Sequence, residues 1–299
     1  MNTIKTSFSI RDLENLSGIK AHTIRIWEKR YNLLEPERTD TNIRTYNLRS
    51  LQKLLNISFL NNNGYKVSKI AALDEFQIAL KVKEISYQGN TESHAFNAFK
   101  LAMLNFDQVL FYNTYNRLLE EKSFREIFYE LFIPIIQDIG LLWQTLTITP
   151  SHEHFLSTHI RQKVLIHIER LQSANPKPET KTFVLFLPLN EIHDIGLLFI
   201  NYELLSRGYH TIYLGENVPI EDLNLINALY DDVTYISYFT VKPNPEDVKN
   251  YLTKLYTEVI ENTTNSVRLI GPRFKDSKPK KTPKKMKIYD SIKKLVKDL

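Results

Sequence analysis

Glu191, His193 and Gly196 form a polar interruption in the apolar stretch FVLFLPLNEIHDIGLLFI, residues 183–200. The run before them is apolar like a strand buried on both faces, and the run after them has the apolar spacing of one helix face. In a doubly wound sheet, ligands bind at loops that follow the carboxyl ends of strands. A histidine two residues after a carboxylate in such a loop is a candidate ligand-holding group, although on spacing alone a solvated histidine is the commoner case.

A second group of informative residues is basic and lies near the N-terminus. The segment from Ser9 to Leu16 is predicted to be a short capped helix, Gly18 a turn, and residues 21–30 a second helix. Basic side chains surround apolar positions such as Trp27 on this second helix, so it would present a basic outer face on an anchored inner one. Two short helices around a tight turn predict a helix-turn-helix whose second helix suits a major groove.

The polar segment TDTNIRTYN, residues 39–47, follows that helix and lies between extended segments, which is typical of a wing. Such a wing would present Arg38 and Arg44 to phosphates. Two further helices are expected over residues 48–61 and 67–73. The candidate DNA-binding residues are His22, Thr23, Arg25, Lys29, Arg30, Arg38, Arg44 and Tyr46.

The segments TIRIWEKRYNLLEP, residues 23–36, and NIRTYN, residues 42–47, together resemble the winged helix-turn-helix domain of the MerR family over about residues 7–75. The resemblance implies a double-stranded DNA operator as partner. It also implies a homodimer, because a two-fold protein reads a pseudo-palindromic operator as two half-sites.

Strands and helices are expected to alternate in the C-terminal part of the chain, which positions the Glu191 loop. Five strands are predicted over residues 183–187, 210–214, 233–239, 267–270 and 286–289, with crossover helices between them. This predicts a flavodoxin-like, Rossmann-type parallel five-stranded sheet in the order 2-1-3-4-5. The loops after strands one and three then flank one crevice, so His193 and Ser237 should approach the same site.

Helical periodicity dominates the middle of the chain. Four helices are predicted over residues 94–104, 107–121, 123–145 and 150–171, which is the count of a four-helix bundle. Trp143, Glu153 and His154 lie near the last turn between them. Considered alone, Trp143 could simply fill the bundle, and Glu153 could favour the macrodipole of a first helical turn.

Glu-x-His-x-x-Gly at residues 191–196 resembles the cobalamin-binding motif Asp/Glu-x-His-x-x-Gly. Trp-x9-Glu-His at residues 143–154 resembles the helical cap motif of the cobalamin-dependent photoreceptor branch of MerR regulators, the CarH/LitR type. The resemblance implies adenosylcobalamin as cofactor, a homotetramer in the dark and a response to light. The cofactor-binding residues it implies are Trp143, Glu153, His154, Glu191, His193, Gly196, Ser237 and Gly271.

The same resemblance assigns a role to each of these positions. His193 would be the lower cobalt ligand, and Glu191 would accept a hydrogen bond from its second ring nitrogen. In the family the tryptophan packs over the upper ligand, the glutamate contacts the adenosyl group, and the histidine can take the upper cobalt position after light. The positions here are Trp143, Glu153 and His154.

Two departures from the family pattern concern the displaced nucleotide tail of the cofactor. Ser237 matches the serine of the Ser-x-Leu element, but Phe239 replaces its leucine. After the fourth strand the usual Gly-Gly is Gly271-Pro272, and proline adds a ring and removes an N–H.

The composition of the 299-residue chain excludes several classes of protein. Cysteine is absent, which excludes disulfides, thiolate metal sites and cysteine nucleophiles and fits a reducing compartment. No apolar run approaches the roughly 20 residues of a membrane span, and no signal-like segment opens the chain. A cytoplasmic protein without a membrane partner is expected. Its net charge of +5 is modest, so the placement of the basic residues matters more than their sum.

Three hypotheses follow. The first is a MerR-type regulator, expected to be a repressor, that senses adenosylcobalamin. The second is the same regulator with a degenerate pocket controlled by a protein partner, and the third is a corrinoid methyl-carrier or enzyme subunit. The DNA-binding pattern counts against the third, and no nucleophile or acid/base pair outside the cofactor motif indicates an enzyme. The expected domains are a winged helix-turn-helix domain over residues 1–75, a linker helix over 76–90, a four-helix bundle cap over 91–175 and a cobalamin-binding-like α/β domain over 180–299.

Overall fold

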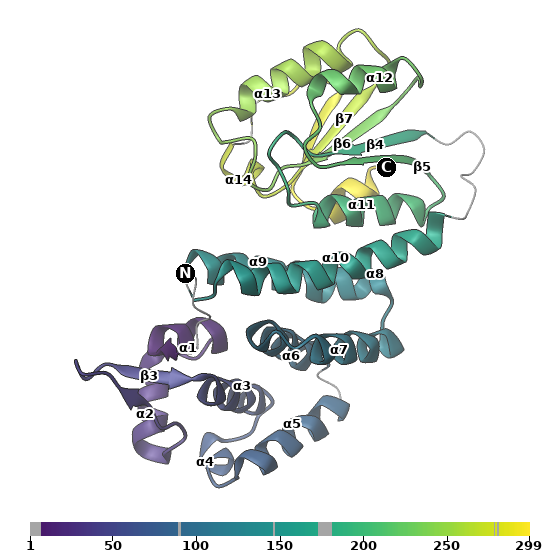
Figure 1. Ribbon diagram of the computed structural model, residues 1–299. Coiled ribbons are helices and arrows are strands. Elements are labelled where there is room, and N and C mark those ends of the chain that lie inside the picture. The colour runs from purple at the N-terminus through teal and green to yellow at the C-terminus, as the bar shows by residue number, and fades with distance from the viewer. Residues whose placement is uncertain (1–6, 89–90, 146, 173–180, 278, 280) are drawn as a thin grey trace. The chain divides into compact units, whose positions relative to one another are not determined.

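The computed structural model describes residues 7–88, 91–145, 147–172, 181–277, 279 and 281–299 (Figure 1). Contacts group the chain into two compact units, Met1–His159 and Ile160–Leu299, which we call the first and second units. The division falls within helix α10 (Pro150–Gln172). Residues 89–90 of the predicted linker helix and residues 173–180, at the boundary between the predicted bundle and the predicted α/β domain, lie outside the described residues.

The first unit opens with a winged helix-turn-helix arrangement. A three-stranded sheet has the order β1-β3-β2, and both pairings are antiparallel. The elements are β1 (Ser7–Ser9), α1 (Ile10–Ser17), α2 (Ala21–Tyr31), β2 (Glu37–Arg38), β3 (Arg44–Asn47), α3 (Leu48–Asn62), α4 (Val67–Ile70) and α5 (Glu75–Gln88). The predicted wing is therefore confirmed as the β2–β3 hairpin, and residues 75–88 form a helix.

Local signals define the ends of α1. Ser9 accepts a hydrogen bond from the Asp12 N–H, and the Asp12 side chain accepts one in return from the Ser9 N–H, which is a capping box. At the other end Gly18 has φ +74°, a left-handed conformation that suits glycine, and its N–H bonds to the carbonyl of Glu14. Both ends match the sequence prediction.

Helices form the rest of the first unit, and α10 continues into the second. They are α6 (Thr91–Asn105), α7 (Gln108–Glu121), α8 (Phe124–Ile127), a π-turn (Phe128–Phe132), α9 (Ile133–Gln144) and α10. Buried aromatic rings fill the space between them. For example, the ring centroids of Phe99 and Phe111 lie 5.0 Å apart.

The third predicted helix, residues 123–145, contains a π-turn that the periodicity did not predict. Within it, the Ile133 N–H donates to the carbonyl of Phe128, five residues earlier. Pro134 follows at once and has no N–H to donate into the preceding turn, so the helical ladder is already interrupted there.

The second unit contains a five-stranded parallel sheet in the order β5-β4-β6-β7-β8. In chain order this is 2-1-3-4-5, as predicted. The strands are β4 (Thr182–Phe186), β5 (His210–Gly215), β6 (Thr234–Tyr238), β7 (Ser266–Ile270) and β8 (Met286–Tyr289). Residues 183–187 are all buried, which confirms a central strand covered on both faces.

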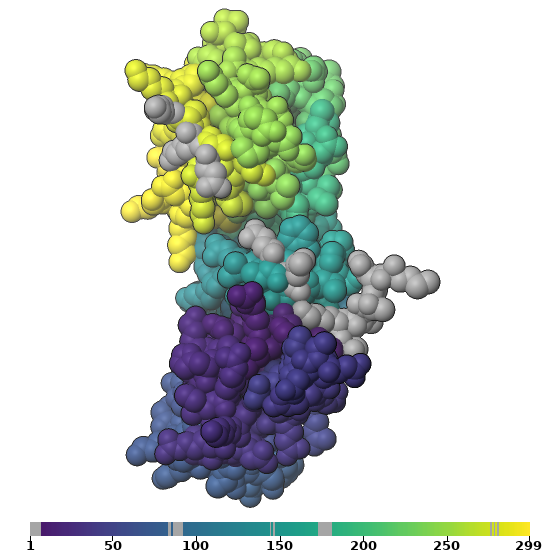
Figure 2. All heavy atoms as spheres, turned by 90° about the vertical axis from the view of Figure 1, so that its left-hand side faces the viewer, coloured from purple at the N-terminus to yellow at the C-terminus, as the bar shows by residue number. Residues whose placement is uncertain are grey.

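Helices cover both faces of this sheet (Figure 1). They are α11 (Ile195–Leu205), a 3-10 turn (Ile220–Asp222) with α12 (Leu223–Asn227), α13 (Val248–Leu255) with a π-turn (Tyr256–Ile260), α14 (Phe274–Ser277) and α15 (Ile292–Lys297). In the space-filling view the yellow C-terminal residues lie against yellow-green residues of the same unit (Figure 2). Leu295 is buried, so α15 belongs to the body of the unit. No helix among the described residues is both long and apolar enough to cross a membrane.

Candidate cofactor site and DNA-binding face

Glu191 joins the two loops that flank the crevice of the sheet. Its side chain is completely buried. One carboxylate oxygen, Oε1, accepts hydrogen bonds from Nδ1 of His193 at 2.5 Å and from the N–H groups of Ile192 and His193 at 3.0 Å each. The other oxygen, Oε2, accepts from three successive N–H groups after β6, residues 240–242, at 3.1, 2.6 and 2.7 Å.

These hydrogen bonds decide the charge of the Glu191 side chain. Burial is the largest single effect and opposes ionisation, but the His193 ring and the N–H groups of Lys242, Val241 and His193 outweigh it. Together they lower the pKa of Glu191 from 4.5 to about 2. The buried carboxylate is therefore ionised at neutral pH and holds the two loops together.

His193 combines a fixed ring with solvent access. Its side chain is 45% exposed, while its Nδ1 contacts the Glu191 carboxylate. An ionised acceptor at Nδ1 favours the tautomer with the proton on that nitrogen, and then Nε2 has the lone pair that can bind a metal. The predicted hydrogen bond between Glu191 and the histidine ring is confirmed.

Exposed apolar side chains occur in the three chain segments that meet at the carboxyl edge of the sheet near this histidine. Leu189 and Ile192 come from its own loop, Leu214 from the end of β5 and Val241 from the loop after β6. Hydrogen bonds link these three chain segments, because the Leu187 N–H donates to the Gly215 carbonyl and the N–H groups of residues 240–242 donate to the Glu191 carboxylate. Exposed apolar residues that gather around a polar group are typical of a ligand-binding face.

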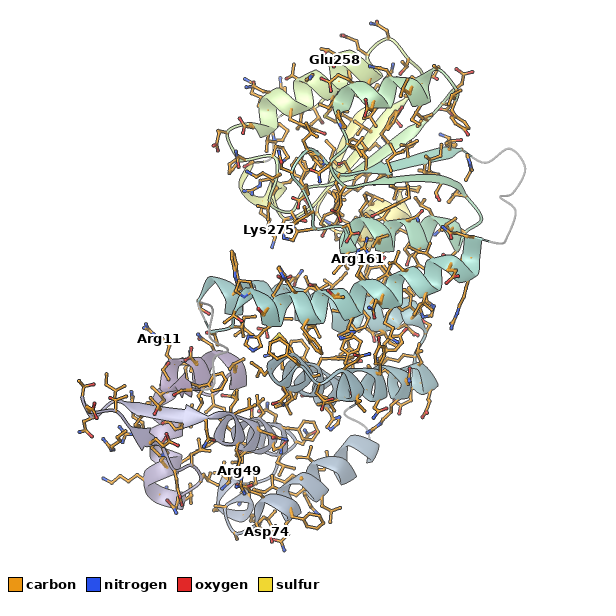
Figure 3. The ribbon with its side chains drawn as sticks, in the orientation of Figure 1. Arg11, Arg49, Asp74, Arg161, Glu258 and Lys275 are labelled. Carbon is orange, nitrogen blue, oxygen red and sulfur yellow. The ribbon has the colours of Figure 1, made fainter. Side chains whose placement is uncertain are left out.

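A partly buried ion pair includes Asp194, which lies within the motif, and the sequence prediction missed it. Asp194 is buried at the start of α11, and Nε of Arg161 donates to its carboxylate at 2.7 Å. Figure 3 shows Arg161 on α10, in the part of that helix that belongs to the second unit. Burial raises the pKa of Asp194, and the Arg161 hydrogen bond opposes this effect.

Tyr213 adds a buried hydroxyl near this ion pair. Burial, followed by the Asp194 charge, raises the pKa of Tyr213, and its hydroxyl has no hydrogen-bond partner among the described residues. A carboxylate directly after the motif histidine was the only sequence signal for this cluster. Its partners, Arg161 and Tyr213, come from distant segments that spacing does not connect.

Three other predicted cofactor residues pack against the chain itself. Ser237 is fully buried, and its hydroxyl donates to the carbonyl of Phe186 on the neighbouring strand at 2.8 Å. Gly196 lies against the ring of Tyr238, and Gly271 lies against the backbone of Phe239. The His193 loop and the loop after β6 do meet through Glu191, but Ser237 lies within β6 and its side chain bonds to the neighbouring strand.

The cap residues belong to the first unit. Trp143, near the end of α9, is 50% exposed, so it does not fill the bundle interior. The Glu153 carboxylate and the ring of His154 are neighbours at the start of α10, with Oε2 and Nε2 3.4 Å apart. The His154 side chain is 73% exposed. No group of three metal-ligating side chains occurs within the described ranges, so a metal site here would depend on a cofactor that supplies the other ligands.

The candidate DNA-binding face combines α2 and the wing. His22, Arg25, Lys29 and Arg30 are exposed on α2, Thr23 is partly exposed, and Arg38 is exposed on the wing. A groove of about 520 Å³ lies between the helix and the wing, and Arg25, Lys29, Arg38 and Arg44 contribute four cations to its lining. The inner side of α2 is anchored because Trp27 and Tyr31 pack against a core cluster that includes Ile57 and Phe59.

Glu28 connects α2 to the wing and corrects one predicted contact. Its carboxylate accepts a hydrogen bond from Nε of Arg44 at 3.2 Å and another from the hydroxyl of Tyr46. Tyr46 is only 1% exposed, and burial together with Glu28 raises its pKa. The prediction that Tyr46 contacts DNA is therefore wrong; Tyr46 instead supports the wing, while Arg44 remains at the groove.

Hydrogen bonds also connect the winged helix to the helical bundle within the first unit. Nδ2 of Asn15 in α1 donates to Oγ1 of Thr147, in the turn between α9 and α10, at 3.0 Å. Nζ of the buried Lys100 donates to the carbonyl of Leu16 at 3.2 Å and pairs with Asp138 at 2.6 Å. A cation at this carbonyl favours the C-terminal end of α1.

Comparisons with known proteins agree with both halves of this description. Residues 8–76 match the model of the MerR HTH family regulatory protein, and residues 95–166 match that of the B12 binding domain. The HTH-type transcriptional repressor CarH of Myxococcus xanthus is 28% identical over 83% of this chain and 84% of its own length. The repressor CarA of the same organism is 21% identical over 81% of this chain and 80% of its own length. These similarities support a CarH-like regulator with a MerR-type DNA-binding domain and a B12-binding domain.

A solved structure supports the fold over about two thirds of this chain. The monomethylamine corrinoid protein of Methanosarcina barkeri superposes with a TM-score of 0.55 and 13% identity, covering 69% of this chain and 97% of that one. At this identity the likeness shows the fold alone. The regulator class instead follows from the MerR domain and from the related proteins, whose names state transcriptional repression.

Proposed function

We propose that this MerR-family chain is a transcriptional repressor controlled by cobalamin that binds at the Glu191–His193 loop. Repression is the activity that the names of the two Myxococcus relatives state for those proteins. The observation that supports the cofactor site is an ionised, buried Glu191 carboxylate that holds Nδ1 of an exposed histidine. A metal-binding histidine commonly has this kind of acceptor at its other ring nitrogen.

The residues around His193 fit a flat, largely apolar ligand. The imidazole supplies one neutral nitrogen donor, which suits cobalt, and Leu189, Ile192, Leu214 and Val241 supply exposed apolar contacts. Cobalamin in its adenosyl form supplies a cobalt–carbon bond that light can break. In this chain Glu191 would orient the His193 ring, and the loop after β6 would keep Glu191 ionised.

For the upper side of the cofactor, the proposal follows the family pattern in the first unit. Trp143 would cover the adenosyl group, Glu153 would contact it, and His154 would take the upper cobalt position after illumination. The exposure of Trp143 and of the His154 ring supports their availability to a ligand.

On DNA, we propose a homodimer or homotetramer on a pseudo-palindromic operator. The support is the basic groove between α2 and the wing, because one such groove reads one half-site. Sedimentation in the dark, with and without adenosylcobalamin, tests the oligomer. A monomer under all conditions would contradict this part of the proposal.

A titration with adenosylcobalamin in the dark, followed by visible absorption, tests the cofactor. Wild type should show the shift of histidine-bound cobalamin, and His193→Ala should lose it. His154→Ala is the matched control, because it should keep the dark spectrum and change only the spectrum after illumination. Loss of the dark shift in both variants, or in neither, would contradict the assignment of His193.

A regulator with a degenerate pocket, controlled by a protein partner, is the second candidate. The packing of Tyr238 on Gly196 and the Gly271-Pro272 sequence favour it, since both occupy positions that the family keeps open. If neither wild type nor Pro272→Gly retains adenosylcobalamin at micromolar concentration in equilibrium dialysis, this second candidate replaces the first.

A further inference from the structure

The side chain of Tyr238 lies directly over the glycine of the Glu-x-His-x-x-Gly motif. A Cβ atom built on Gly196 would lie 2.6 Å from Cε2 and 2.7 Å from Cζ of the Tyr238 ring. These distances are far below van der Waals contact, so the aromatic ring rests on the bare backbone of the first turn of α11. The Tyr238 side chain is partly exposed, and the burial of the rest of it raises its pKa to about 12.

The neighbouring backbone is also covered by the chain itself. A Cβ on Gly271 would lie 2.1 Å from the carbonyl oxygen of Phe239, and Gly271 has φ +133°. The Phe239 N–H donates to the carbonyl of Ile270 at 2.7 Å, and its carbonyl accepts from the N–H of Arg273 at 3.1 Å. The Phe239 ring stacks on Phe274 with the ring centroids 5.0 Å apart. Among the described residues, the backbone at Gly271 is therefore covered by the Phe239 segment.

The chemistry of the ligand makes this packing important. In free cobalamin a nucleotide tail is tethered to the lower face of the corrin ring, and its base occupies the lower cobalt position. If His193 takes that position, the tail is displaced on the same side, into the protein next to the histidine loop. Gly196 lies three residues after His193, and the Tyr238 ring occupies the space beside it.

We propose that Tyr238 is a specificity-determining residue that makes the chain discriminate against the nucleotide tail of a corrinoid. This inference rests on the proposed cobalamin function. A corrinoid without the tail, of the cobinamide class, needs only His193 and the exposed apolar residues around it. A complete cobalamin must in addition move the Tyr238 ring from Gly196, and that displacement weakens its binding.

The test compares two probes, aquocobalamin and diaquocobinamide, on the full-length chain. Dissociation constants come from equilibrium dialysis, and visible absorption reports whether histidine binds the cobalt. Cobinamide has no base of its own to displace, so it favours histidine in any protein; the informative quantity is how the ratio of the two dissociation constants changes between variants. Tyr238→Ala should lower the ratio of cobalamin to cobinamide by at least about tenfold, which corresponds to about 1.4 kcal/mol.

Tyr238→Phe is the matched control because it keeps the ring and should keep the wild-type ratio. Circular dichroism of each variant shows whether the sheet has folded. A ratio that stays within about twofold in a folded Tyr238→Ala variant would overturn this inference while leaving the proposed function intact. If neither probe binds to folded wild type or to folded Tyr238→Ala, the proposed cobalamin function itself is overturned.

Discussion

Replacing Glu191 by Gln should destabilise the second unit by about 3 kcal/mol, and two related routes give this magnitude from the same hydrogen bonds. Gln is similar in size but carries no charge, and one of its two terminal groups is a donor. The NH₂ group of the introduced glutamine would face N–H groups that now donate to Glu191. In one orientation of the amide these are the three N–H groups of residues 240–242, and in the other they are the N–H groups of its own loop. Each buried N–H left without an acceptor costs about 1 kcal/mol or more.

The second route uses the charge of the same carboxylate. Its pKa is about 2 in the folded chain, against 4.5 for an ordinary glutamate, and one pKa unit corresponds to about 1.4 kcal/mol. The difference therefore corresponds to about 3 kcal/mol as well. Because the folded pKa is depressed, this stabilisation is fully present above pH 4.5 and is lost as the pH falls toward 2. The difference in free energy of unfolding between wild type and Glu191→Gln should therefore narrow as the pH falls from 4.5 toward 2.

Two measurements check this prediction. Urea unfolding followed by circular dichroism gives the stability of the second unit, and amide hydrogen exchange of residues 240–242 reports the local bonds directly. Glu221→Gln is the control, since Glu221 pairs with Lys254 on an exposed surface and its loss should change stability by less than about 0.5 kcal/mol. The reasoning fails if Glu191→Gln matches that control and the amides of residues 240–242 exchange as slowly as in wild type.

Three further predictions concern other parts of the chain. Arg25→Ala should weaken binding to an operator and flatten the salt dependence by about one ion, measured by gel shift at several salt concentrations, with Lys294→Ala in the second unit as control. Lys100→Met should destabilise the first unit by roughly 2 kcal/mol because it leaves Asp138 without its cation, and adding Asp138→Leu should recover part of the loss on urea unfolding. Burial, followed by the charges of nearby Arg and Lys side chains, lowers the pKa of His167 to about 4. Wild type should therefore lose stability as the pH falls from 6.5 to 4, because the unfolded chain binds a proton that the folded chain excludes. In His167→Gln the thermal unfolding temperature should change less across that pH window.

The sheet could be predicted from the sequence because its signals are local. Each strand is a short apolar run bounded by polar or glycine residues, and crossover connections allow few arrangements of five parallel strands. Gly208 shows how a single residue completes such a prediction: its φ of +80° ends α11 and returns the chain to β5. The helix-turn-helix was predictable for the same reason, from a capping residue and a glycine turn.

Side-chain partners that lie far apart in the sequence could not be predicted in this way. Tyr46 and Arg44 both bond to Glu28 only because the wing folds back onto α2. The types of these residues alone therefore do not distinguish a side chain that contacts DNA from one that supports the wing. The hydrogen bond from Asn15 to Thr147 joins residues 132 positions apart. Neither polar residue has a charge, a repeat or a spacing that would mark it.

The Glu-x-His-x-x-Gly motif contains both kinds of information. Glu191 and His193 are two residues apart, so their hydrogen bond depends on one short loop, and the prediction of this contact is confirmed. Gly196, in contrast, has meaning only through what faces it, and that is Tyr238 on a strand 42 residues later in the chain. A motif can therefore show how a metal-binding nitrogen is oriented while leaving open how much of a ligand fits beneath it. The physical reason is that hydrogen-bond geometry in a loop is set locally, whereas the free volume next to a glycine is set by whichever distant side chain packs there.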